Sequence, residues 1–395
     1  MSEFPAKTDV LIVGAGPTGL ALAASLAQAG VDHVLIDKLA AGQSTSRAAV
    51  IHAHTLEALE TLGVADRLSD TGLKLTRFSI RDRDRTLVQL GFDALPSKFS
   101  YLLMTPQDTT ERVLAERHEE LGGRIHRGVV AERIEQHSDY VRAWLRDSDV
   151  DRAIDARYVV GADGMHSIVR ESAGIDFDGA QYAHSFVLAD VKMDWKPGRE
   201  EVFLFFTEHG PLVVAPLPNG NFRIVVAMEH APEHPDVACI QNVIDDYGPT
   251  DANATVSRVD WSSRFRIHHR LAKSYRRGRL FIMGDAAHVH SPAGGQGMNT
   301  GLVDATVLGR VLAGVVSGVH PEETLDAYEQ LRRPAARKVL ELADGLTQMA
   351  MTHGALARQA RNVRLSVINH LPPVKRALTM NLSGLSRRAQ AELAR

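Results

Sequence analysis

The chain of 395 residues is short of cysteine and carries no strong excess of either charge. Its single cysteine, Cys239, excludes an intrachain disulfide and a cysteine-based zinc cluster, so we expect no metal site. A net charge of −3 leaves no basic footprint for nucleic acid, so we expect no such partner. The content of 24% charged and 44% hydrophobic residues is ordinary for a globular protein, and we expect a cytoplasmic location.

Long uncharged stretches are also scarce. The main exception, Val10–Gly30, has the length of a membrane span or of a signal peptide. It contains several early glycines and has no basic segment before it, which favours a buried strand, turn and helix instead. A later apolar run is interrupted by Asp304 and Arg310. We therefore expect no membrane-spanning helix.

The first motif with chemical content follows the β-branched run Asp9–Val13, which predicts a buried parallel strand. In the next six residues, Gly14 permits a sharp turn, Gly16 permits close approach of a pyrophosphate, and Gly19 permits the next helix to pack on the strand. The helix is expected from about Thr18 to Gln28, ending at Gly30, and its N-terminus favours phosphate.

An acidic residue follows this unit at the expected distance. The strand His33–Ile36 ends at Asp37, 18 residues after Gly19, where a carboxylate accepts hydrogen bonds from the ribose of an adenosine. Such a carboxylate repels a 2′-phosphate. The site therefore suits FAD or NAD better than NADP.

Two further strands end in glycine-containing loops. The strand Ala156–Val160 leads into Asp163-Gly164 and a helix that starts near Ser167, although such a loop by itself is often only a turn. The strand Arg279–Met283 leads into the sequence GDAAH at 284–288, and a glycine-rich segment follows at 294–301. Its backbone amides suit a flat ring system, and a helix is expected from about Gly301 to Leu312.

Taken together, these motifs identify a family. The chain resembles the single-component (group A) FAD-dependent aromatic monooxygenases, which share the p-hydroxybenzoate hydroxylase fold. The resemblance extends from about residue 8 to 340. It rests on Gly14, Gly16, Gly19, Asp37, Arg47, Gln107, Asp163, Gly164, Arg170, the segment from Gly284 to Asn299, and residues 261–265 and 328–334.

The resemblance implies how each motif meets FAD. The first glycine turn and the acid would hold the ADP half, Arg47 and Gln107 the ribityl-pyrophosphate region, and Asp285 the ribityl chain. Asp163 and Gly164 belong to a loop shared with the incoming nicotinamide nucleotide, and the segment from Pro292 to Asn299 would face the isoalloxazine. The implied cofactor-binding residues are Gly14, Gly16, Pro17, Thr18, Gly19, Asp37, Lys38, Arg47, Gln107, Asp163, Gly164, Gly284, Asp285, Pro292, Gly295, Gly297, Met298 and Asn299.

The residues of the chemical step are less defined. We assign Pro292 and Gly295 to it because they lie in the segment from Pro292 to Asn299, and His288 because it lies in the same family motif, which starts at Gly284. Imidazole titrates in the useful range, so a substrate base is sought among the histidines, although a structural role is favoured for most of them. The candidates are His52, His54, His184, His288 and His290.

The implied fold class is an α/β FAD-binding, Rossmann-like domain with an inserted α+β substrate domain on an antiparallel sheet and a C-terminal helical region. The FAD-binding domain is expected to comprise residues 1–72, 100–173 and 276–325. The substrate domain is expected at 73–99 and 174–275, where a hairpin pattern and alternating strands such as Glu201–Phe206 and Phe222–Val226 occur.

The tail, 326–395, is expected to form helices at Ala335–Met351, Leu356–Val367 and Val374–Leu382. It contains many basic residues. A packed helical cap with a solvated edge is favoured over a face that meets a membrane, so no membrane contact is expected.

The activity implied by the resemblance is hydroxylation of a phenolic or polycyclic aromatic substrate through a flavin C4a-hydroperoxide, with NADH or NADPH as transient co-substrate and O₂ as oxidant. Two alternatives stay open: a ubiquinone-pathway-type hydroxylase of a lipid-soluble ring, and a non-hydroxylating flavoprotein with a redox-sensing or partner-binding role. A flavin-dependent halogenase is disfavoured because Trp195-Lys196-Pro197 does not match its WxWxIP motif. The protein is expected to be a monomer or a homodimer.

Overall fold

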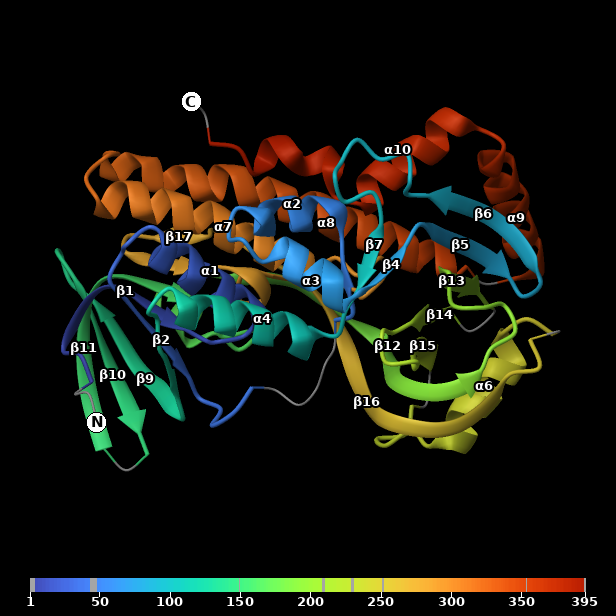
Figure 1. Cartoon of the computed structure of the whole chain (residues 1–395), viewed down its shortest axis with the longest axis horizontal. Coiled ribbons are helices and arrows are strands. Elements are labelled where there is room, and N and C mark those ends of the chain that lie inside the picture. The colour runs from blue at the N-terminus through green and yellow to red at the C-terminus, as the bar shows by residue number, and fades with distance from the viewer. Residues whose placement is uncertain are drawn as a thin grey trace.

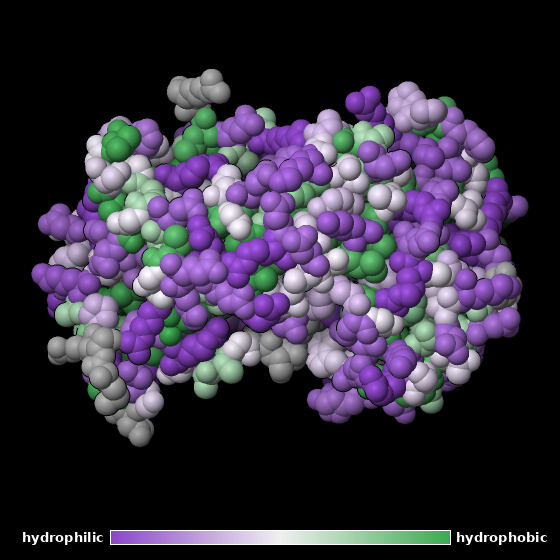
Figure 2. Space-filling view, viewed as in Figure 1, coloured by the Kyte–Doolittle hydropathy of each residue, from purple (hydrophilic) through white to green (hydrophobic). Residues whose placement is uncertain are grey.

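The computed structural model describes residues 4–42, 48–148, 150–207, 210–228, 231–250, 252–352 and 354–393. The predicted FAD ligand Arg47 lies outside these residues. The molecule is elongated, with one large sheet toward each end and a layer of long helices running along both (Figure 1). Figure 2 shows that the face in this view is mainly hydrophilic, with scattered hydrophobic patches.

The first sheet is built around β1 (Lys7–Val13), whose Val10, Leu11 and Ile12 are fully buried. Its two neighbours and the strands beyond them run parallel to it, so their carboxyl ends share one edge. The order is β17-β18-β11-β1-β2-β8, and β10 and β9 extend antiparallel from β11. The other strands are β2 (His33–Asp37), β8 (Ile125–Arg127), β9 (Val129–Gln136), β10 (Val141–Asp147), β11 (Val150–Gly161), β17 (Arg276–Arg277) and β18 (Leu280–Ile282).

Helices cover this sheet. α1 (Pro17–Gln28) is rich in alanine and leucine, and it packs against both α4 (Gln107–Glu120) and α7 (Gly297–Val316). Among the described residues, α7 alone has the length and apolarity of a candidate membrane span, with Asp304 and Arg310 inside it. In the protein 78% of its most apolar window is buried, which makes α7 a core helix.

The second sheet has the order β19-β16-β12-β15-β14-β13-β5-β6 and is antiparallel except between β13 and β5. In its core, beside α6 (Val237–Tyr247), Trp195 packs edge to face against Phe203 and Phe205 and lies tilted against Phe222. Its strands are β5 (Arg77–Asp82), β6 (Arg85–Gly91), β12 (Phe177–Asp194), β13 (Glu201–Phe206), β14 (Pro211–Pro216), β15 (Phe222–Met228), β16 (Thr255–Ala272) and β19 (His288–Val289).

A small third sheet lies between the two large ones. Its order is β3-β7-β4, formed by β3 (Val50–Ile51), β7 (Leu102–Met104) and β4 (Leu73–Leu75). The short helices α2 (Ala53–Glu60) and α3 (Ala65–Thr71) lie between β3 and β4 in sequence, and α5 (Ile168–Ser172) follows β11. The second sheet contains strands from both predicted substrate-domain segments. It also contains β19, which lies in a segment predicted for the FAD-binding domain. The domain boundaries therefore remain a prediction.

The tail is helical as expected: α8 (Asp326–Ala350), α9 (Ala355–Asn369) and α10 (Pro372–Leu382), with 3₁₀ turns at Gly284–Ala286, Glu322–Leu325 and Leu385–Gln390. Two predicted starts are wrong. α8 begins nine residues before Ala335 and contains Pro334, because side-chain bonds of Arg332 and Arg333 anchor the turn around the proline. α7 begins at Gly297, before the expected Gly301.

Candidate functional site

The first glycine turn has the geometry that close phosphate approach requires. Gly14 has a φ of +105°, and a Cβ on it would lie 2.4 Å from the carbonyl oxygen of Ala162. A Cβ on Gly19 would lie 1.9 Å from the carbonyl oxygen of Gly14. A Cβ on Gly16, in contrast, would meet no atom within 4 Å. Gly14 and Gly19 therefore shape the turn, while Gly16 leaves open space at the N-terminus of α1.

Asp37 lies beside this turn, at the end of β2. One carboxylate oxygen accepts from the backbone N–H of Ala15 at 2.6 Å, and the other accepts from the N–H of Leu39 at 2.8 Å. Each oxygen keeps a further lone pair for a ribose hydroxyl. The neighbouring Lys38 is exposed.

The two distant glycine motifs meet at Thr18. A Cβ on Gly284 would lie 2.8 Å from the Thr18 hydroxyl oxygen, and one on Gly301 would lie 2.5 Å from the same atom. Gly284 has a φ of +57°, which favours glycine. The start of α1, the turn after β18 and the first turns of α7 therefore pack without side chains between them.

The Asp163-Gly164 loop joins the same edge. The Asp163 carboxylate accepts from the N–H of Ile168 at 2.8 Å at the start of α5, and its other oxygen is buried with no hydrogen-bond partner among the described residues. Burial raises the pKa of Asp163. Arg170 donates to the carbonyl oxygens of Met165 and Ala286, so it ties this loop to the turn after β18.

The segment from Pro292 to Asn299 is held in one shape by its own bonds. Gly294 and Gly295 have φ of +81° and +62°, and Gly295 donates to the Pro292 carbonyl oxygen at 2.9 Å. The Asn299 side chain donates to the carbonyl oxygens of Val50 and Gly295 and accepts from the N–H of His52 at 2.8 Å. This fixes the segment against β3 and α2.

The remaining predicted residues occupy the rim of the same region. Gln107 lies at the start of α4, and its side-chain oxygen accepts from the N–H of Ala48 at 3.3 Å. Asp285 is exposed in the turn after β18, and Met298 is half-buried in the first turn of α7. Gly297, like Pro292, is half-buried.

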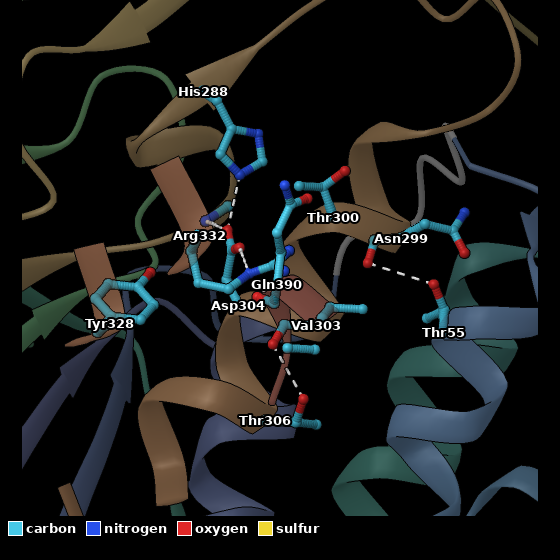
Figure 3. Close-up of polar contacts among 12 residues, drawn as sticks. Thr55, His288, Asn299, Thr300, Val303, Asp304, Thr306, Tyr328, Arg332 and Gln390 are labelled. Atoms are coloured by element: carbon cyan, nitrogen blue, oxygen red, sulfur yellow. Dashed lines mark hydrogen bonds and ion pairs between the residues drawn. The ribbon is translucent and has the colours of Figure 1, made fainter. Parts of the chain in front are cut away.

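His288 belongs to a buried charged cluster that Figure 3 shows. Its Nε2 lies 2.7 Å from one oxygen of Asp304, and Arg332 Nε donates to the other oxygen at 2.8 Å. Burial alone would raise the pKa of Asp304, but Arg332 and His288 outweigh it and hold that pKa below its ordinary value. Asp304 also accepts from the N–H of Gly284 at 3.3 Å. His288 thus braces the turn after β18, which favours the structural role expected for it.

Of the other candidate histidines, His52 and His54 are buried and His290 is half-buried. Burial lowers the pKa of His52 to about 4 and that of His290 to about 4, so both are neutral at pH 7. His52 Nε2 lies 2.8 Å from the Gly294 carbonyl oxygen. Burial also lowers the pKa of His54. The side chain of His184 lies outside the described residues.

Two cavities among the described residues bear on the site. A small one of about 20 Å³ lies behind the flavin-facing segment and is lined by His52, His54, Gln296, Arg332 and Arg387, among others. A wider, open hollow of about 400 Å³ lies in the second sheet beside Trp195 and contacts none of the predicted site residues. Neither has the size and place of a flavin pocket, so the case for FAD rests on the loops.

Four buried polar residues of this region were not predicted as site residues: Asp304, Arg332, Gln296 and Arg387. Gln296 donates to the Leu382 carbonyl oxygen at 2.9 Å and accepts from Arg387 at 2.9 Å, which ties the flavin-facing segment to the tail. One signal was available, because an acid within the apolar run of α7 requires a buried partner. The sequence did not predict which residue this partner is, because Arg332 lies 28 residues after Asp304.

The described residues fit FAD. The open space at Gly16 suits a pyrophosphate, the free lone pairs of Asp37 suit a ribose, and the buried unpartnered oxygen of Asp163 suits a hydroxyl donor. The three loops lie at the shared carboxyl edge of β1, β11 and β18, which is where nucleotides bind in such sheets.

Comparison with known proteins also indicates FAD. The FAD binding domain family matches residues 7–343. Pentachlorophenol 4-monooxygenase of Sphingobium chlorophenolicum is 33% identical over 369 residues, covering 90% of this chain and 68% of the relative. 6-Methylpretetramide 4-monooxygenase of Streptomyces rimosus is 35% identical over 394 residues, covering 97% and 71%.

Solved structures give the same fold. The crystal structure of p-nitrophenol 4-monooxygenase from Pseudomonas putida DLL-E4 superimposes with a TM-score of 0.88 at 23% sequence identity. The match covers 96% of this chain and 99% of that chain. At this identity the likeness establishes the fold alone.

Proposed function

The chain belongs to the FAD binding domain family, within its group A aromatic monooxygenases, and from this membership we propose that it hydroxylates a phenolic or polycyclic aromatic ring. It is a flavoprotein monooxygenase that uses FAD, O₂ and a reduced nicotinamide nucleotide. The two curated relatives are named for a chlorinated phenol and for a pretetramide. These names favour a phenolic or polycyclic aromatic ring.

The observation that carries the proposal is the meeting of the two glycine motifs at Thr18. The first motif alone is common to many dinucleotide-binding proteins. Here residues more than 260 positions apart pack with no side chain between Gly284, Gly301 and the Thr18 hydroxyl. This packing places the flavin-facing segment and the phosphate turn on one edge of one sheet.

Bound FAD supplies hydride acceptance and activation of oxygen. The residues of the chain bind and orient it: the N–H groups at the start of α1 meet the pyrophosphate, and Asp37 accepts from the ribose. We propose that Asp163, Gly164, Lys38, Gln107, Asp285 and Arg47 complete the nucleotide site.

The flavin-facing segment positions the reacting ring. We propose that Pro292 and Gly295 contact the isoalloxazine through backbone that Asn299 holds rigid. His288 acts on that segment only through Asp304 and is a positioning residue in this scheme. The neutral histidines His52 and His290 exclude water and add no charge there.

The remaining expectations are proposals of the same kind. We propose that the enzyme works in the cytoplasm as a monomer or homodimer on a small aromatic substrate. A ubiquinone-type lipid-soluble ring is the first alternative, and activity that requires detergent or lipid would favour it. A non-hydroxylating flavoprotein is the second.

The test is stopped-flow absorbance of the FAD-loaded protein with NADH and then NADPH, in the presence of single phenols, polycyclic phenols and quinones. We expect one class of aromatic compound to accelerate bleaching of the flavin by at least tenfold. With ¹⁸O₂, the product should gain one labelled oxygen atom. Rapid reduction without any aromatic compound, or no reduction with all of them, would count against a hydroxylase and favour the second alternative.

A further inference from the structure

The helices α9 and α10 carry an unusual share of the exposed hydrophobic surface. Ten large hydrophobic side chains are exposed among the described residues, and five of them lie between positions 356 and 374. Their exposed fractions are 83% for Leu356, 55% for Val363, 55% for Val367, 43% for Leu371 and 38% for Val374. We call these five residues the apolar ridge.

The α9 members of the apolar ridge share one face of that helix. Leu356, Val363 and Val367 are separated by seven and four residues, which places them on the same side of α9. Leu371 follows in the turn, and Val374 lies in the first turn of α10. Exposed apolar side chains gathered in one region of a protein surface mark an interaction site more often than scattered single residues do.

The opposite face of α9 is already fixed to the second sheet. Arg85 donates to the Ser366 hydroxyl at 3.1 Å, and the Asn369 side chain accepts from the N–H of Gln89 at 2.9 Å. The Arg361 guanidinium lies 4.8 Å from the ring centre of Phe206. α9 is therefore held with its apolar ridge outward, at the right-hand end of the molecule in Figure 1.

The charge of this region is one-sided. None of the 48 acidic residues of the chain lies between Gly345 and Ala391, whereas seven Lys and Arg residues do. Of these, Arg364 and Arg376 are exposed on α9 and α10. Because the net charge of the whole chain is −3, the rest of the protein carries an excess of negative charge.

We propose that α9 and α10 dock the protein on an anionic phospholipid surface, with the apolar ridge in the headgroup region and Arg364 and Arg376 against the phosphates. Exposed apolar side chains flanked by basic residues are the pattern of helices that lie in the membrane interface. The acidic remainder of the protein is repelled by the same surface, which orients the molecule. The segment 345–391 carries seven basic and no acidic residues, and Asp82 of β5 contacts it at Asn362. A second copy would bring two net basic segments together, so the charge disfavours it.

This inference goes beyond the proposed hydroxylation and does not rest on it. It departs from the expectation, drawn from the sequence, that the tail makes no membrane contact. The test is co-sedimentation of the full chain with vesicles of equal parts phosphatidylglycerol and phosphatidylcholine, compared with vesicles of phosphatidylcholine alone. We expect binding to the anionic vesicles only, weakened when the salt concentration is raised. Equal binding to both vesicles, or to neither, overturns the proposal.

Matched variants distinguish binding through α9 and α10 from non-specific binding by other exposed side chains. The pair Val363→Asn and Val367→Asn, and the pair Arg364→Gln and Arg376→Gln, should each weaken binding roughly tenfold. The controls are Val319→Asn, a valine 72% exposed elsewhere, and Lys7→Gln with Arg112→Gln, exposed cations elsewhere. The controls should bind as the wild type does, and equal loss in variants and controls overturns the proposal.

Light scattering without lipid tests whether a second copy of the chain covers the apolar ridge instead. A dimer that Val363→Asn with Val367→Asn dissociates would show that a second copy covers the apolar ridge, and it would overturn the proposal. Circular dichroism of every variant confirms that the fold is retained.

Discussion

At the scale of single residues, two glycines of one turn have different roles: Gly19 permits packing within the protein, and Gly16 leaves space for a ligand. Gly19 is required by the protein itself, because its Cβ would lie 1.9 Å from the Gly14 carbonyl oxygen. Gly16 has ordinary extended backbone, with φ −74° and ψ −177°, and open space beside it. The protein itself therefore leaves room for a side chain at Gly16, and a bound pyrophosphate would fill that room.

This contrast gives a prediction. Gly16→Ala should leave the melting temperature of the FAD-free protein unchanged and weaken FAD binding by roughly tenfold or more, since the added methyl group meets the pyrophosphate. Gly19→Ala should instead destabilise the FAD-free protein by at least about 2 kcal/mol. Thermal melts and titration of flavin fluorescence measure both. Unchanged FAD affinity in Gly16→Ala would contradict the assigned phosphate site.

His52 gives a second prediction at this scale. Burial lowers its pKa to about 4 in the folded protein, so the unfolded chain, with an ordinary value near 6.5, takes up the proton first. The stability that His52 contributes is therefore complete above pH 6.5 and is lost as the pH falls toward 4. A shift of this size corresponds to roughly 3 kcal/mol.

The measurement is urea unfolding at several pH values between 7 and 4. His52→Gln should lose stability less steeply with falling pH, by one proton, than the wild type does. His320→Gln, at an exposed histidine, is the control and should follow the wild type. An identical pH slope in His52→Gln and the wild type would show that His52 is not buried in its neutral form.

At the scale of elements, α1 and α7 pack closely because glycines of α7 face small side chains of α1. A Cβ on Gly309 would lie 2.2 Å from the Ser25 hydroxyl oxygen, and one on Gly301 would lie 2.5 Å from the Thr18 hydroxyl oxygen. The long α7 thereby connects the flavin-facing segment at its start to the helix that begins at the phosphate turn. Helix propensity alone would favour alanine at these positions.

We predict that Gly309→Ala destabilises the protein by about 1 to 3 kcal/mol, because the methyl group overpacks the contact with α1. Gly345→Ala is the matched control: this glycine lies inside α8, and an added Cβ meets nothing within 4 Å. It should stabilise the protein by about 0.5 to 1 kcal/mol. Urea unfolding measures the free energy of unfolding of both variants. A stabilised Gly309→Ala variant would show that α1 and α7 are not in close contact.

At the scale of the whole molecule, FAD would join parts of the chain that are distant in sequence. The phosphate turn, the loop at Asp163 and the flavin-facing segment belong to three regions, held together at one sheet edge by Thr18, Arg170 and Asn299. A ligand that contacts all three stabilises the folded state and not the unfolded chain.

Removal of FAD should therefore lower the melting temperature, and its return should raise it in proportion to the logarithm of the free FAD concentration. At one hundred times the dissociation constant the gain is about 2.7 kcal/mol. Differential scanning calorimetry over a range of FAD concentrations measures it, with AMP as a control for the adenosine part alone. A melting temperature independent of FAD would contradict the assigned cofactor site.

The sequence by itself determined the features that are local in the chain. The strand, glycine turn, helix and Asp37 follow from spacing within 30 residues, and the existence of three tail helices was also predicted, with a wrong start for the first. The alternating strands of the second sheet were also readable. The physical reason is that turn geometry, helix capping and burial patterns act between near neighbours, so the residue order carries them.

Only the tertiary structure decided the features that join distant residues. Asn299 bonds to His52, 247 residues away, and this contact together with α1 turns the expected loop at Gly297 into helix. The buried group of His288, Asp304 and Arg332 and the outward face of α9 depend on which surfaces pack together. Packing between such elements is selected by the whole fold, and no short segment of sequence specifies it.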